Sequence, residues 1–249
     1  MLFADNEIWP TGGWGSIEYG SVGFTNGTVL GGRWKPLQYY FKDHLYTDLF
    51  VVCGNDGRCL VKNDSPLKGF NGVLKLTALN VSNSAVIAVN STAISLHAGA
   101  GAATWLCAAG NGSPMDETCD SWSDLLAPLG AAPDQAVLIT ELLSADGTVQ
   151  YSSFELLSTP ADMLDALPKA TVSATVGTPS TNGSSVPVTV STDGAALFVG
   201  LTTAAHGRFS RNFFILPQGH ISVDFIPFGI LDTAMLAATL RVEHVRSYL

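Results

Sequence analysis

Most of the chain, from residue 49 onward, consists of short apolar runs bounded by Asn, Asp, Gly and Ser, which is the pattern of β-strands joined by turns. A helical turn is predicted at residues 121–129, where Ser121 and Asp124 have the spacing of a capping box. The strands predicted in the first half of this region are residues 49–53, 58–62, 73–80, 85–89, 92–96, 104–107, 136–143 and 149–156. Their number and spacing favour an immunoglobulin-like sandwich over residues 47–160.

A second β-rich region follows a proline-bounded connector at residues 158–168, which has room for one helical turn. Apolar and polar residues alternate most clearly at Val186, Val188 and Val190, and Pro187 within this run predicts an edge strand. The strands predicted here are residues 170–176, 186–190, 196–202, 213–216, 220–226 and 238–245. We therefore expect a second, smaller immunoglobulin-like sandwich over residues 161–249.

The charge of the chain limits its partners. Its net charge is −9, only 13% of its 249 residues are charged, and no Lys/Arg cluster occurs. Such a chain is not expected to bind nucleic-acid phosphates or anionic membranes. No apolar run reaches the roughly 18 to 20 residues that span a membrane. The sequence also has no Walker loop and no dinucleotide-binding motif, so we expect no cofactor.

The cysteines fall into two pairs with short spacing, Cys53 with Cys59 and Cys107 with Cys119. Neither pair has the spacing of a zinc finger, and no histidine cluster lies nearby, so we expect local disulfides and no metal site. Asn-x-Ser/Thr triplets occur at Asn26, Asn63, Asn80, Asn90, Asn111 and Asn182. Proline follows two of them, which leaves Asn26, Asn80, Asn90 and Asn182 as the predicted glycosylation acceptors.

Disulfides and glycosylation acceptors together predict the secretory route, with a lysosomal or secreted destination. The first residues have neither the basic nor the apolar region of a signal peptide. We therefore expect this chain to be made as part of a longer precursor.

Residues 6–41 differ from the rest because tryptophans and tyrosines are concentrated there among glycines. A helix is predicted at residues 33–44, with Pro36 in its first turn. The apolar stripe of this helix needs a packing partner and consists of Trp34, Leu37, Tyr40, Phe41 and Leu45. Trp9, Trp14 and Tyr19 fit either a surface that stacks on sugars or a packed core.

Glu7 and Glu18, near the start of the chain, are candidates for a catalytic pair. A retaining glycosidase needs two carboxyl groups about 5 to 5.5 Å apart, held on different strands. Glu7 and Glu18 lie in one short segment, which favours carboxylates that cap backbone N–H groups. The polar loop at residues 206–211 is predicted to be a corner of the second sandwich.

Three separated motifs resemble the β-mannosidases of glycoside hydrolase family 2. The first lies at residues 6–39, where NEIWP, WGSIEYG and GRWKPLQY correspond to the family forms N-D-I-W, S-W-x-S-x-E-Y-G and G-(R/K)-W-K-x-L-H-Y. The second is FELLSTP at residues 154–160, which resembles the family's F-x-x-x-S-x-P. The third is GRFSRN at residues 207–212, which resembles G-R-F-S-D-N. All three occur in the family's order.

This resemblance implies a mainly β chain in which two immunoglobulin-like sandwiches follow the last strand, loop and helix of a (β/α)8 barrel. Residues 1–46 would be the barrel remnant. The family's two catalytic glutamates lie on earlier strands, so this chain would be inactive alone, and its partner, a β-mannosyl oligosaccharide, would bind through the missing barrel. The resemblance places Trp9 and Trp14 near the sugar as barrel-mouth aromatics.

Several residues depart from the family pattern. Phe3 stands where the family has Trp, Glu7 where it has Asp, Gln38 where it has His, and Arg211 where it has Asp, and residues 21–30 are inserted. Two other interpretations therefore stay open. One is a stand-alone glycan-binding or partner-binding sandwich protein, and the other is a degenerate enzyme kept as a partner subunit. The sequence does not indicate an oligomeric state.

Overall fold

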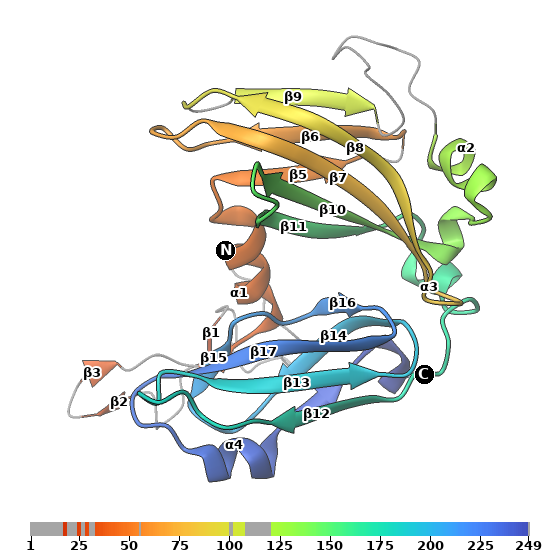
Figure 1. The fold of residues 1–249 in the computed structure, drawn as a ribbon. Coiled ribbons are helices and arrows are strands. Elements are labelled where there is room, and N and C mark those ends of the chain that lie inside the picture. The colour runs from red at the N-terminus through yellow and green to blue at the C-terminus, as the bar shows by residue number, and fades with distance from the viewer. Residues whose placement is uncertain are drawn as a thin grey trace, which may run out of the picture. The chain divides into compact units, whose positions relative to one another are not determined.

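The structure is a computed structural model that describes residues 17–18, 24–25, 28–29, 33–54, 56–99, 102–107 and 121–248. Its contacts divide the chain into two compact units (Figure 1). The first unit is Tyr46–Pro168. The second unit combines the described residues up to Leu45 with those from Lys169 onward.

Two antiparallel sheets form the first unit (Figure 1). One has the order β5-β6-β9 and consists of β5 (Leu49–Cys53), β6 (Arg58–Asn63) and β9 (Ala102–Cys107). The other has the order β11-β10-β7-β8 and consists of β7 (Phe70–Asn80), β8 (Val86–Leu96), β10 (Ala136–Ser144) and β11 (Val149–Leu156). The helices of this unit are α2 (Trp122–Leu126), η3 (Ala127–Leu129), η4 (Pro133–Gln135) and α3 (Pro160–Met163).

Alternate residues of these strands point inward and form the core of the first unit, because successive side chains of a strand face opposite sides. Val61, Leu74 and Leu138 are among the fully or almost fully buried residues of this core. Trp122 of α2 also packs into it, and its indole N–H donates to the carbonyl of Gly54 at 2.7 Å. This bond ties the helix to the end of β5.

The second unit also has two main sheets (Figure 1). One has the order β12-β13-β17-β15 and consists of β12 (Val172–Val176), β13 (Val186–Thr192), β15 (Gly207–Phe209) and β17 (Gly219–Pro227). The other has the order β16-β14-β18 and consists of β14 (Ala196–Thr202), β16 (Phe214–Leu216) and β18 (Arg241–Glu243). Helix α4 (Thr233–Thr239) and the 3-10 helix η5 (Val245–Tyr248) complete this part.

The described N-terminal elements belong to the second unit. They are β1 (Ile17–Glu18), β2 (Phe24–Thr25), β3 (Thr28–Val29), β4 (Arg33–Trp34), α1 (Pro36–Tyr40) and the π-helix η2 (Phe41–Leu45). β1 pairs with β4 and β2 pairs with β3, both antiparallel. Tyr39 is part of the buried core of this unit, together with residues of β13, β14 and β17.

The predicted mainly β fold class with immunoglobulin-like sandwiches is confirmed. The barrel remnant at residues 1–46 stays a prediction, as does the division at residues 47–160 and 161–249. Within the described part of the chain, no helix is long and apolar enough to cross a membrane.

The predicted helix at residues 33–44 differs from the structure at its start and in its buried face. Arg33 and Trp34 pair with β1, so the helix begins only at Pro36. The predicted stripe included Tyr40, but Tyr40 is 56% exposed and Tyr39 is 3% exposed. Only about one turn of α-helix precedes the wider π-helix, so a regular 3.6-residue period misplaces the buried side.

The prediction of a strand at residues 238–245 is wrong over most of its length. Helix α4 runs to Thr239, and the strand is limited to Arg241–Glu243. The signal for the helix is Asp232, whose side chain accepts the N–H of Met235 at 2.8 Å and caps the first turn.

The predicted edge position of Pro187 is also wrong, because β13 lies between β12 and β17. Gly177 donates its N–H to the carbonyl of Pro187 at 2.7 Å, just beyond the last residue of β12. The missing N–H of Pro187 therefore falls where the pairing with β12 has ended.

The predicted strands at residues 85–89 and 92–96 form one strand, β8. Leu76 pairs with Asn90 and Thr77 pairs with Ala88, so Val89 is an extra residue on β8. A β-bulge of this kind continues the strand past the polar residues that resemble a turn in the sequence.

The two sheets of the first unit depend on the packing of their inward residues. Leu138 is fully buried, and Leu67 is 85% exposed. We expect Leu138→Ala to lower the free energy of unfolding of this unit by about 2–5 kcal/mol, because it leaves a cavity. Leu67→Ala is the control and should change it by less than about 0.5 kcal/mol. Hydrogen exchange of β7 and β10 amides in the full chain measures both, and equal effects would contradict the described core.

Candidate functional site

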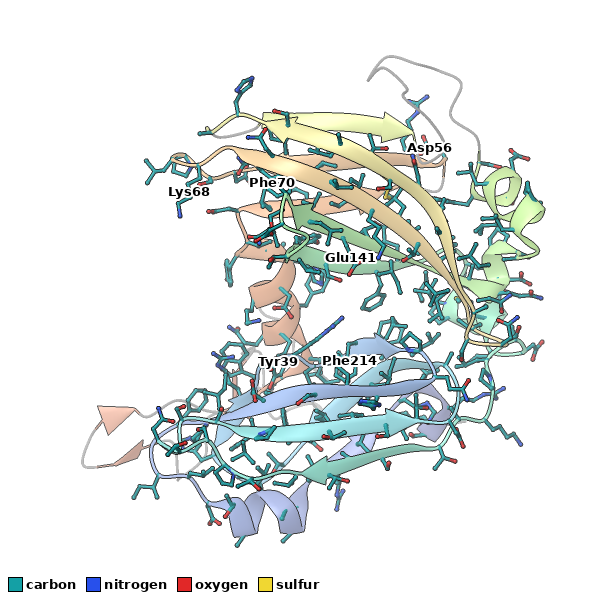
Figure 2. The ribbon with its side chains drawn as sticks, in the orientation of Figure 1. Tyr39, Asp56, Lys68, Phe70, Glu141 and Phe214 are labelled. Carbon is teal, nitrogen blue, oxygen red and sulfur yellow. A yellow bond between two sulfur atoms is a disulfide. The ribbon has the colours of Figure 1, made fainter. Side chains whose placement is uncertain are left out.

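Two segments with motifs that resemble the glycosidase family, residues 33–39 and 207–212, come together in the second unit. The backbone N–H of Phe209 donates to the Tyr39 hydroxyl oxygen at 3.0 Å, across 170 positions of sequence. Figure 2 labels Tyr39 on α1. Since the Tyr39 side chain is almost fully buried, this bond fixes the helix to strand β15.

Aromatic rings surround this hydrogen bond. The Trp34 and Tyr39 ring centroids are 5.3 Å apart and meet edge to face, and the Phe213 ring lies 6.1 Å from Tyr39. The Arg208 guanidinium carbon lies 4.8 Å from the centre of the Trp34 ring, within the range of a cation–π interaction. We call Trp34, Tyr39, Arg208, Phe209 and Phe213 the aromatic junction.

Asn212 holds one side of the aromatic junction in place. Its Oδ1 accepts the N–H of Leu201 at 2.7 Å and that of Phe213 at 3.1 Å, and its Nδ2 donates to the Leu201 carbonyl at 2.9 Å. The side chain therefore satisfies both backbone groups of one residue of β14, as a neighbouring strand would. Asn212 is 7% exposed, so these groups would otherwise be buried without partners.

Phe213 has a backbone conformation that bulky residues rarely adopt, with φ at 54°. Such a conformation persists when the surroundings hold it. Its N–H is bound by Asn212, and its ring lies against Gly200, where an added Cβ would be 2.8 Å from Cε1 of Phe213. A glycine at position 200 thus leaves the space that Phe213 needs to reach Tyr39.

The polar groups of the aromatic junction hold backbone and rings together. Burial raises the pKa of the Tyr39 hydroxyl above its usual value, although the bond from Phe209 acts in the opposite direction. Tyr39 therefore stays neutral and acts as a hydrogen-bond acceptor. The arrangement joins two distant segments, and it presents no activated nucleophile or acid.

Glu141 and Glu155 do not form a facing pair of carboxyl groups. Glu141, labelled in Figure 2, is opposite Ser152 in the sheet register, and Glu155 is opposite Leu138, so the two point to opposite faces. Glu141 also forms an ion pair with Lys75 at 3.0 Å. Glu18 lies in β1, and Glu7 lies outside the described residues. In the described ranges, no cluster of three or more His, Cys, Asp or Glu could hold a metal ion.

Several of the predicted site residues lie outside the described residues. These are the proposed sugar-stacking residues Trp9 and Trp14, the acceptor Asn26, and Cys119. Cys107 ends strand β9. Cys53 and Cys59 form a disulfide across the β5–β6 hairpin, where they are register partners.

The three described acceptor asparagines have different surroundings. Asn182 is exposed in a turn, where its Oδ1 accepts the N–H of Ser184 at 3.1 Å. Asn90 is half-buried on β8, next to the bulge. Asn80 is only 5% exposed, and its Oδ1 accepts both the N–H and the hydroxyl of Ser82. Asn182 is therefore the most accessible of the three to a glycan.

Sequence reasoning did not find Tyr39, Asn212 or Glu155. Asn212 had a signal, because it ends the GRFSRN motif. Glu155 had none, because apolar and polar residues do not alternate clearly in β11; only the sheet register places it on the same face as the buried Tyr151. Glu155 accepts the N–H of Cys53 at 2.6 Å, and burial raises its pKa to about 7.

Residues 167–248 match the family model Ig_mannosidase, an Ig-fold domain. Among solved structures, the chain resembles the β-D-mannosidase from Dictyoglomus thermophilum with a TM-score of 0.60 and 17% identity, over 85% of this chain and 23% of that one. It also resembles the exo-chitosanase CsxA from Amycolatopsis orientalis with a TM-score of 0.50 and 14% identity, over 83% of this chain and 26% of that one. No curated protein is significantly similar in sequence.

The predicted resemblance to glycoside hydrolases of family 2 is confirmed at the level of the fold. This chain spans about a quarter of the length of the two solved proteins, which are 23% and 26% covered. At 17% and 14% identity, the likeness concerns the fold alone.

The Tyr39 hydroxyl can be removed without removing its ring. We expect Tyr39→Phe to destabilise the second unit by about 1–3 kcal/mol, because the N–H of Phe209 is left buried without a partner. Tyr40→Phe is the matched control at a side chain that is 56% exposed. Exchange of the Phe209 amide in the full chain measures the effect. Similar exchange rates in both variants would contradict the role of the hydroxyl.

Glycosylation can be compared between an exposed and a buried acceptor. In a secreting eukaryotic host, we expect folded protein to carry a glycan at Asn182 and none at Asn80. Asn182→Gln should therefore remove the mass of one glycan, and Asn80→Gln should leave the mass unchanged apart from the substitution. Mass spectrometry of the secreted protein is the measurement. An occupied Asn80 in folded protein would contradict the expected effect of burial.

Proposed function

We propose that this chain is the C-terminal portion of a retaining β-mannosidase that removes terminal β-D-mannosyl residues from oligosaccharides. The observation that carries the proposal is the aromatic junction. In it, the segment that resembles the end of a glycosidase barrel packs into the core of the unit that contains the Ig_mannosidase match. That packing suits a terminal sandwich that supports a barrel.

The chain's own part in this function is structural. Retention requires two facing carboxyl groups, and Glu141 and Glu155 point to opposite faces of their sheet. We infer that the catalytic glutamates and the sugar site belong to a barrel outside this chain. The Tyr39 bond and the Trp34–Arg208 contact would then hold the last barrel helix against the sandwich, and so limit its movement relative to the active site.

Mannose as the sugar is supported by the motifs at residues 6–39, which resemble those of β-mannosidases in particular. The fold likeness to the Dictyoglomus thermophilum β-D-mannosidase adds support. Lysosomal or secreted localisation is supported by the Cys53–Cys59 disulfide and by the exposed acceptor Asn182.

The test compares this chain with a longer product. The 5′ end of the transcript is mapped, and the product of the longest frame that includes this chain is purified beside the 249-residue chain. We expect the longer product to hydrolyse 4-nitrophenyl β-D-mannoside, with β-mannose as the first product in an NMR time course. We expect no turnover by the shorter chain, because we infer that the carboxyl pair belongs to the barrel outside it.

Three other outcomes would contradict the proposal in different ways. Turnover by the 249-residue chain would place the catalytic carboxyl groups within it. Turnover of the β-D-glucosaminide alone by the longer product would change the sugar. A transcript with no longer frame, together with saturable binding of mannan to this chain, would favour a glycan-binding protein without catalysis.

A further inference from the structure

The two sheets of the first unit approach each other along strands β5 and β11. Each is an edge strand of its own sheet, and no backbone pairing joins them. They nevertheless pack against each other. Edge strands carry unpaired backbone N–H groups, and these need other partners when they are shielded from water.

Glu155 supplies such a partner. From β11, its Oε1 accepts the backbone N–H of Cys53 on β5 at 2.6 Å. Its side chain is partly buried and lies on the same face of β11 as Tyr151, which belongs to the core. An inward acidic residue on an edge strand therefore connects the two sheets.

We propose that protonation of Glu155 controls how tightly the two sheets of the first unit are joined along β5 and β11. This edge is closed in mildly acidic solution and loosened in mildly basic solution. The proposal does not depend on the function proposed above, because it concerns only contacts within the first unit.

The physical reason is the competition between burial and hydrogen bonding. The Cys53 N–H favours the ionised carboxylate, but partial burial disfavours it more strongly, and the pKa of Glu155 is raised to about 7. Once ionised, the carboxylate gains hydration by turning toward water. That movement breaks the bond to Cys53 and exposes the β5 edge.

The charged groups around Glu155 do not oppose this behaviour. On β10, Glu141 points to the opposite face of the sheet and is paired with Lys75. On β5, the only group of a titratable type is Cys53, which is held in the disulfide. On β11 itself, Tyr151 is the other group of this kind. Burial is the cause of the raised pKa, the bond from the Cys53 N–H acts in the opposite direction, and no charged group contributes to the shift.

The sign of the pH effect follows from the raised pKa. Between its usual pKa of 4.5 and about 7, the folded protein keeps a proton that the unfolded chain has lost. The stabilisation is therefore complete below pH 4.5 and is lost as the pH rises through about 7.

The experiment measures hydrogen exchange of the Cys53 amide in the full chain, corrected for the intrinsic rate at each pH. We expect its protection factor to fall by up to about 30-fold between about pH 5.5 and about pH 7, and to level off from there to about pH 8.5. Glu155→Gln keeps the acceptor oxygen without the charge, so its protection factor should stay constant over this range. Glu141→Gln is the matched control on the other face and should retain the wild-type profile.

Either of two results would overturn the proposal. One is a wild-type protection factor for Cys53 that does not change with pH, which needs no variant to be folded. The other is a Glu155→Gln variant whose protection factor falls as much as that of the wild type. The activity of a longer enzyme plays no part in this test, so its outcome is separate from that of the mannosidase assay.

Discussion

The bond from the Phe209 N–H to the Tyr39 hydroxyl is the interaction on which the second unit depends. It lies inside a core, so the groups that make it would be costly to bury alone. The Tyr39 ring also packs against the Trp34 ring, and the Arg208 guanidinium lies over the face of Trp34. A short helix that could not be stable by itself is thereby fixed to a sandwich that follows it by more than 120 residues.

Strand existence could be predicted from the sequence because alternation and turn residues are local signals. Residues 49–53 and 196–202 were predicted with the bounds that the structure has. Ser121 was predicted as a helix cap, and its hydroxyl accepts the N–H of Asp124. Predicted element boundaries were wrong where pairing with a distant strand sets them. Trp34 is an example, because it belongs to a strand that pairs with β1.

The candidate site was less predictable, because it depends on residues that are distant in sequence. The motifs around Trp34 and Arg208 were recognised separately, but nothing in either one indicates that they touch. The apolar period predicted that the Tyr40 ring is buried, whereas the structure buries the Tyr39 ring. Periodicity is therefore a poor guide to the buried face of a helix this short. The acidic residue at position 155 lies on the core face of its strand, on the same side as Tyr151, and only the sheet register shows this. Departures of this kind from an apolar core mark positions with a special role.

The side-chain amide of Asn212 has a consequence for the lifetime of the protein. It donates to the Leu201 carbonyl and accepts from two N–H groups, so it needs both its nitrogen and its oxygen. Spontaneous deamidation would convert it to a carboxylate. A carboxylate oxygen would then face the Leu201 carbonyl oxygen inside a core, with no hydrogen between them. The bulky Phe213 that follows and the 7% exposure of Asn212 both hinder that reaction. The fold thus protects from deamidation a side-chain amide that β14 uses in place of a neighbouring peptide group.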